Sequence, residues 1–102
     1  MPRKFDCLSA LRALGEENRI RILRLLLAGE HCVNEIAEAL GITQYNISRH
    51  LKVLKSAQLV EVTRLGQQRI YNLAEGFRGH LSKEGRVLDL GCCQFDFSQL
   101  PK

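Results

Sequence analysis

Residues 33–54 read VNEIAEALGITQYNISRHLKVL, and this stretch decides the fold. Apolar residues recur at helical spacing on both sides of Gly41. They predict a first helix of about two turns before the glycine, and a second helix that Thr43 caps. A glycine lets the chain reverse at this junction without a steric cost. The stretch therefore predicts a helix-turn-helix.

Two further helices are predicted upstream of this motif. The first runs from Phe5 and ends at Gly15, because apolar residues recur there at three-residue intervals. The second is capped by Asn18 and stays apolar on nearly all sides until Gly29. A helix of that composition belongs in the core.

Downstream, residues 59–64 and 69–73 have strand composition and flank the turn sequence LGQQ, residues 65–68. They predict a β-hairpin. A short helix is expected around Phe77–Glu84, and residues 87–90 are equally compatible with a helix or an extended strand. The predicted fold class is therefore mainly α with a β-hairpin wing.

Length and composition predict one compact unit. The chain has 102 residues, 45% of them hydrophobic, which is enough for one core and too few for two ordinary domains. We expect a single domain over residues 1–102, with residues 86–102 as a cysteine-bearing C-terminal tail. No run of about 18 apolar residues is present, nor a signal peptide, so we expect a cytoplasmic chain with no membrane partner.

The positive charge is localised. Between Thr43 and Leu73 there are five basic residues and one acidic residue, which gives 5 − 1 = +4, the net charge of the whole chain. A localised basic face indicates a polyanionic partner. The alternative is an ordinary solvated helix face.

The second helix of the motif presents polar side chains opposite its apolar face, and the hairpin adds two arginines. Glutamine can pair with adenine, arginine with guanine, and lysine with phosphate groups. Each such residue alone is weak evidence for DNA binding. The whole set, together with the helix-turn-helix and the hairpin, is strong evidence. The residues expected to contact duplex DNA are Thr43, Gln44, Tyr45, Ser48, Arg49, Lys52, Lys55, Arg64 and Arg69.

Several spaced runs within roughly residues 5–73 resemble the ArsR/SmtB family of metal-sensing repressors. They are ALGEENRIRIL (13–23), IAEALGITQ (36–44), ISRHLKVL (47–54), and LV (59–60) leading to RIY (69–71). The resemblance implies a winged helix-turn-helix in which the helix after Thr43 reads DNA. It also implies a homodimer, formed by the first and last helices, on a palindromic operator.

The chain has four cysteines, and Cys92 and Cys93 are adjacent. Adjacent thiolates can chelate one soft ion, and a third sulfur would complete the site. Cys7 and Cys32 are both candidates for that third ligand. Both are also in step with apolar helix positions, so the alternative is that they are small buried hydrophobic residues.

The family resemblance narrows the choice of inducer. Many arsenic-responsive members carry a cysteine cluster before the recognition helix, of which only Cys32 is present here. The run LDLGCC, residues 88–93, is similar to arsenic sensors with a C-terminal cysteine pair, which implies arsenite or antimonite. The family's zinc site is not expected, because His80 is the sole histidine in the C-terminal region, whereas His31 could assist a metal site beside Cys32.

Two other functions are alternatives, a methyltransferase and a thiol sensor. The run RVLDLGC, residues 86–92, resembles the first motif of S-adenosylmethionine-dependent methyltransferases, but that motif requires a following helix within an α/β sheet. No other catalytic set is evident, so we expect no enzyme. A thiol redox or persulfide sensor of the same fold would instead form a disulfide from two of the cysteines.

Overall fold

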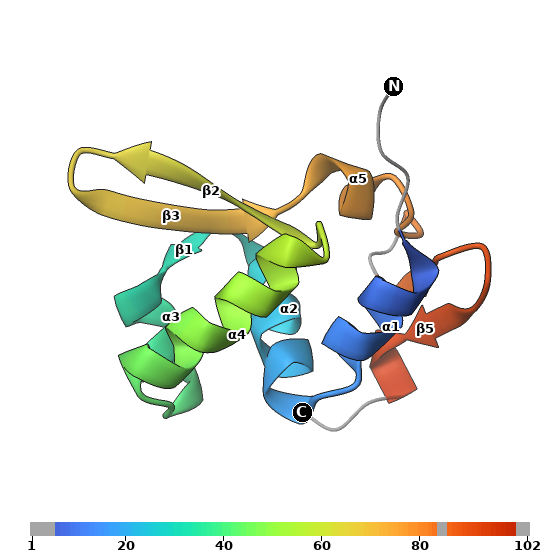
Figure 1. Cartoon of the computed structure of the whole chain (residues 1–102), viewed down its shortest axis with the longest axis horizontal. Coiled ribbons are helices and arrows are strands. Elements are labelled where there is room, and N and C mark those ends of the chain that lie inside the picture. Colours follow the sequence, from blue (N-terminus) through green and yellow to red (C-terminus); the bar gives the residue numbers. More distant parts are fainter. Residues whose placement is uncertain (1–5, 84–85, 100–102) are drawn as a thin grey trace.

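The computed structural model of the chain describes residues 6–83 and 86–99. Helices α1 to α4 precede a β-hairpin, and a second, smaller hairpin follows it (Figure 1). In chain order, the elements are α1 (Cys7–Leu14), α2 (Glu17–Ala28), β1 (His31–Cys32), α3 (Val33–Leu40), α4 (Gln44–Ser56), β2 (Val60–Leu65), β3 (Gln68–Leu73), α5 (Glu75–Arg78), β4 (Val87–Asp89), β5 (Gln94–Asp96) and the 3-10 helix η1 (Phe97–Gln99).

The helix-turn-helix forms where it was predicted. Helix α3 ends at Gly41, whose φ of 68° lies in the left-handed region that glycine enters without strain. Thr43 caps α4, because its hydroxyl accepts a hydrogen bond from the Asn46 amide at 3.2 Å. The buried face of α4 consists of Ile47, Leu51 and Leu54.

The predicted cap of α2 was wrong. The cap is Glu16, whose carboxylate accepts hydrogen bonds from the amides of Asn18 and Arg19, both at 3.2 Å. Helix α2 therefore begins at Glu17, with Asn18 inside its first turn. A carboxylate at this position also interacts favourably with the positive end of the helix dipole.

Strands β2 and β3 form the predicted antiparallel wing, closed by the pairing of Leu65 with Gln68. A third strand, β1, was not predicted. It consists of two residues and pairs with β3, so that the sheet order is β1-β3-β2. This short strand attaches the start of α3 to the middle of β3.

The C-terminal region differs most from the prediction. Helix α5 has only four residues, and Glu84, where the predicted helix ended, lies outside the described residues. The open choice for residues 87–90 is resolved as strand β4, which pairs with β5. Leu88, Leu90 and Phe97 are buried in the main hydrophobic cluster. This C-terminal segment therefore packs on the helical core, next to α1 (Figure 1).

Helix α1 has one buried face and one exposed face. Its buried residues are Ala10, Ala13 and Leu14, whereas Leu8 is 55% exposed. Among the described residues, no helix is long and apolar enough to cross a membrane.

Candidate functional site

The residues predicted to contact DNA are exposed on α4, at its N-cap and on the wing. All nine are exposed, since the opposite side of α4 packs into the core. We call this surface the basic face; it consists of Thr43, Gln44, Tyr45, Ser48, Arg49, Lys52, Lys55, Arg64 and Arg69.

Two side chains of the basic face interact with each other. The Arg49 guanidinium lies 5.9 Å from the centre of the Tyr45 ring, within the range of a cation–π contact. Tyr45 is itself 72% exposed. The contact restricts both side chains on the outer side of α4, so less conformational entropy is lost when they bind a partner.

The wing carries two like charges in direct opposition. Arg64 and Arg69 are cross-strand partners in the β2–β3 ladder, and both are exposed. Like charges directly opposite each other destabilise a hairpin. A polyanion placed against this pair would remove the repulsion, which makes the wing suited to binding phosphate groups.

The structure brings together three of the four cysteines, from opposite ends of the chain. Cys7, the first residue of α1, forms a disulfide with Cys92 in the turn between β4 and β5, with a Cα–Cα distance of 6.5 Å. The sulfur of Cys93 lies 3.9 Å from that of Cys92. Cys93 is a free thiol and is half-buried. We call these three residues the cysteine site.

The turn that carries Cys92 and Cys93 is held by hydrogen bonds. One oxygen of the Asp89 carboxylate accepts from the Gly91 amide at 2.9 Å, and the other from the Gln94 side-chain amide at 3.4 Å. The Leu90 amide donates to the Cys93 carbonyl at 2.9 Å. Asp89 thus fixes both ends of the turn. Sequence reasoning missed this role, although an aspartate two residues before a glycine is a typical turn signal.

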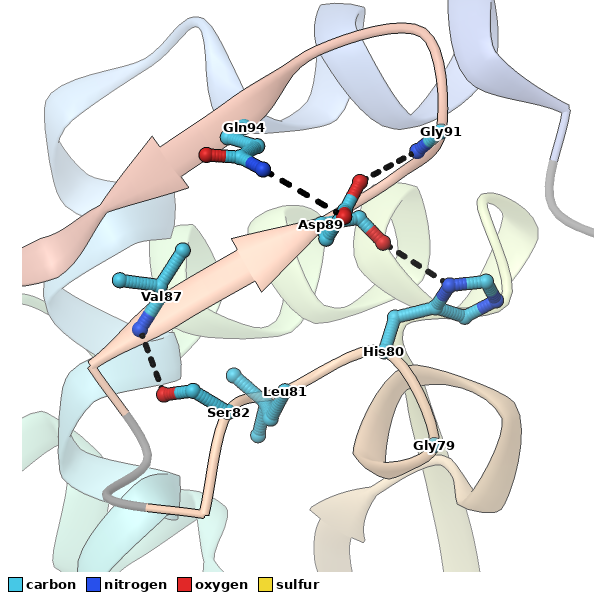
Figure 2. A pocket seen from close by; sticks show the side chains of 8 residues that line it. All are labelled: Gly79, His80, Leu81, Ser82, Val87, Asp89, Gly91 and Gln94. Carbon is cyan, nitrogen blue, oxygen red and sulfur yellow. Dashed lines mark hydrogen bonds between the residues drawn. The ribbon is translucent and has the colours of Figure 1, made fainter.

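An open pocket of about 510 Å³ lies beside this turn, between the β4–β5 hairpin and the segment after α5 (Figure 2). Its polar groups engage one another: His80 Nδ1 lies 2.9 Å from the Asp89 carbonyl oxygen, and the Ser82 hydroxyl accepts from the Val87 amide at 3.2 Å. These contacts brace the hairpin against the segment that follows α5. His80 lies beyond the short α5 instead of on a helix.

Cys32 lies apart from the other cysteines, in the three-stranded sheet at the start of α3. Its amide donates to the Glu35 carboxylate at 2.9 Å, and this bond holds the pKa of Glu35 below its ordinary value. The same carboxylate lies 3.7 Å from His31. Of the two candidates for a third sulfur, the structure places Cys7, and not Cys32, beside the vicinal pair.

No three histidine, cysteine, aspartate or glutamate side chains within residues 6–83 and 86–99 are arranged to hold a metal ion. In the disulfide form, two of the three sulfurs of the cysteine site are bonded to each other. A bond to a soft ion requires thiolates. The cysteine site would therefore have to be reduced before it could bind such an ion.

The methyltransferase-like run folds differently from a cofactor site. Residues 90–93 connect two antiparallel strands, β4 and β5. In a nucleotide-binding fold the glycine-rich turn leads from a parallel strand into a helix. Between Gly91 and Gln99 the structure has a strand and one three-residue 3-10 helix in that place.

Comparison with known proteins is consistent with this geometry. A sequence model of the family described as "Bacterial regulatory protein, arsR family" matches residues 16–62. The transcriptional repressor SmtB of Mycobacterium tuberculosis is 39% identical over 71 residues, which cover 70% of this chain and 53% of that protein. The arsenical resistance operon repressor of Staphylococcus xylosus is 29% identical over 85 residues, covering 80% of this chain and 82% of that protein. The chain thus spans about half the length of the mycobacterial repressor.

Solved structures share the fold. Mb0332 of Mycobacterium bovis, described as a homodimeric winged helix-turn-helix DNA-binding domain and a possible ArsR-family regulator, superposes with a TM-score of 0.60. It is 36% identical, and the match covers 72% of this chain and 76% of that one. The prediction of a mainly α fold with a β-hairpin wing, a winged helix-turn-helix, is therefore confirmed.

Proposed function

Since the chain belongs to the ArsR family of bacterial regulatory proteins, we propose that it is a transcriptional repressor that binds duplex DNA as a homodimer. The basic face carries this proposal. Helix α4 has an exposed polar side while its opposite side is buried, which is the arrangement of a helix that enters the major groove. Such a regulator would act in the cytoplasm, where the DNA is, and would catalyse no reaction.

The basic face divides into two kinds of contact. The start of α4, with Gln44, Ser48 and Arg49, would read base edges. Lys52 and Lys55, further along α4, and the Arg64–Arg69 pair of the wing would bind phosphate groups and set the orientation.

We further propose that arsenite or antimonite releases the repressor by binding to the thiolates of Cys7, Cys92 and Cys93. The convergence of three sulfurs from distant parts of the chain supports this. Thiolates are the donors that soft ions select, and their deprotonation couples binding to pH. The arsenical resistance operon repressor among the relatives supports the choice of inducer.

The inducer would act at a distance, because the cysteine site joins α1 to the β4–β5 turn and contains no residue of α4. Moving a repressor from almost fully bound to almost fully free takes a differential affinity of about 10⁴-fold, or ~5.5 kcal/mol. Several thiolate bonds, formed in one state and not in the other, supply free energy of that order.

The test is operator binding by the reduced chain with and without arsenite. A labelled duplex, selected from a random-sequence pool by the reduced protein, would be titrated and read by fluorescence anisotropy. We expect tight binding that arsenite abolishes in the wild type but not in the Cys92→Ser/Cys93→Ser double variant. Release of the double variant at the wild-type arsenite concentration would place the sensor elsewhere.

The disulfide itself favours a second candidate, a repressor that senses oxidants. Cys7 and Cys92 would lose two protons and two electrons to form the bond, while a hydroperoxide is reduced to an alcohol and water. Mass spectrometry after peroxide treatment, compared with arsenite titration of the reduced chain, separates the two candidates. Loss of DNA binding with disulfide formation, and no response to arsenite, would favour the oxidant sensor.

A further inference from the structure

A polar contact joins the corner between α1 and α2 to the DNA-facing helix. His50 of α4 lies with its Nδ1 atom 3.4 Å from a carboxylate oxygen of Glu16. The His50 side chain is 20% exposed and that of Glu16 is 34% exposed, so the pair is partly shielded from solvent. His50 stands between Arg49, on the basic face, and Leu51, in the core.

The Glu16 carboxylate is held in place by the helix that it caps. One oxygen accepts from the Asn18 amide, and the other, which also faces His50, accepts from the Arg19 amide. Both oxygens are hydrogen-bonded to the first turn of α2, so that turn orients the carboxylate. It is therefore a rigid attachment point for α4 and not a flexible surface group.

The same turn of α2 is hydrogen-bonded to the end of α1. The Arg19 guanidinium donates to the Ala13 carbonyl at 2.6 Å and to the Arg12 carbonyl at 3.1 Å, in the last turn of α1. The first residue of α1 is Cys7, which is bonded to Cys92. A continuous series of contacts thus runs from the cysteine site through α1, Arg19 and Glu16 to the recognition helix α4.

We propose that Glu16 and His50 are positioning residues that transmit the state of the cysteine site to α4. The inference rests on the proposed function, in which thiol chemistry at Cys7 changes DNA affinity. Helix α1 is only eight residues long, so a shift at its first residue also displaces its last-turn carbonyls. Arg19 and Glu16 would follow, and His50 would rotate or shift the helix that reads the groove.

The chain offers a matched control for this contact. His31 and Glu35 also form a histidine–carboxylate pair, at 3.7 Å, but they are four residues apart and the pair lies at the start of α3. Loss of the His31 contact does not uncouple α1 from α4. A glutamine in place of either histidine removes the imidazole and keeps a polar side chain of similar length.

The experiment compares the 102-residue chain as wild type with its His50→Gln and His31→Gln variants. Affinity for the selected duplex is measured for the reduced chain in dithiothreitol and for the disulfide form prepared with diamide. The ratio of the two dissociation constants measures the coupling between the sites. We expect wild type and His31→Gln to share one ratio. In His50→Gln the difference between the two dissociation constants should shrink by a factor of about three or more, so that the ratio approaches one. Thermal unfolding curves show whether the variants are equally folded.

An unchanged ratio in a folded His50→Gln variant overturns the inference while the proposed switch stands. A wild-type ratio of one overturns the inference together with the oxidant-sensing candidate, and leaves the arsenite proposal to its own titration, whereas absence of wild-type DNA binding in either state refutes the proposed function itself. If His50→Gln does not fold, Glu16→Gln replaces it, because the amide oxygen keeps one of the two cap hydrogen bonds of α2 while the charge facing His50 is lost. The same ratio decides the outcome.

Discussion

The sulfur atoms of Cys7 and Cys92 are bonded across a sequence separation of 85 residues. The bond attaches the first residue of α1 to the turn between β4 and β5, and Cys93 lies directly beside it. The segment that the sequence suggested to be a tail is thus joined covalently to the helices that it packs on. Forming or breaking this disulfide therefore changes how α1 is attached to the β4–β5 turn.

Reduction of this disulfide should lower the stability of the wild type. A cross-link restricts the unfolded chain and typically stabilises a domain by about 2–4 kcal/mol, with the larger values expected for long loops such as this one. We expect the free energy of unfolding in urea to fall by about that amount when dithiothreitol is added. The Cys7→Ser variant should show no dependence on dithiothreitol, and Cys32→Ser should behave like the wild type. A wild type equally stable with the bond intact and reduced would contradict this.

The substitution Gly91→Ala should destabilise the cysteine-bearing turn. Gly91 has a φ of 88°, a conformation that costs an L-residue roughly 1–2 kcal/mol. Gly79 is the control, since its φ is −65° and an added Cβ would meet the Gly76 carbonyl oxygen at an ordinary 3.5 Å. Urea unfolding of the reduced variants should show a loss for Gly91→Ala and no loss for Gly79→Ala. Equal effects would mean that the turn is not constrained as described.

The part of the fold that local signals determine was predictable from the sequence. Between residues 13 and 73, helical spacing, the Gly41 turn and the Thr43 cap each act over a few residues, and they agree with one another. The exposure of the basic face follows from the same pattern, because the buried face of α4 determines the opposite one.

Apart from the cap of α2, which is local, the parts that were missed depend on contacts between distant residues. Strand β4 is defined by its pairing with β5, and this C-terminal segment joins the same hydrophobic cluster as α1. The sequence left Cys7 and Cys32 equivalent, since nothing local indicates which one the C-terminal turn approaches. The Glu16–His50 contact likewise joins positions 34 residues apart, 50 − 16.

The substitution Arg49→Ala should weaken binding to the selected duplex. If Arg49 forms a bidentate contact with guanine, its loss costs about 1–3 kcal/mol and relaxes the preference at one base pair. Lys83→Ala is the control, because Lys83 is exposed but lies outside α4 and the wing. Anisotropy titrations at fixed salt should separate the two variants. Unchanged affinity would remove Arg49 from the residues that read DNA.

If the chain forms the proposed homodimer, the substitution Leu8→Glu should convert it into a monomer. Leu8 is 55% exposed on α1, the helix that the family resemblance places in the dimer interface. A charge there would have to be buried against the partner subunit, which is strongly unfavourable. Leu65→Glu is the control, since Leu65 is 64% exposed at the end of the wing. Light scattering should show dimers for the control only; a dimeric Leu8→Glu protein would exclude this face.

The choice of third sulfur should be decided by removing each candidate separately. Cys7 lies within the cysteine site, whereas Cys32 lies in β1 of the three-stranded sheet. We therefore expect reduced Cys7→Ser to bind the selected duplex normally but to need at least about tenfold more arsenite for release, which is a loss of ~1.4 kcal/mol of coupling. Cys32→Ser should respond like the wild type. Because neither residue is on the basic face, a change in affinity without arsenite would indicate a folding defect. The opposite pattern, with Cys32→Ser insensitive to arsenite, would move the metalloid to the start of α3.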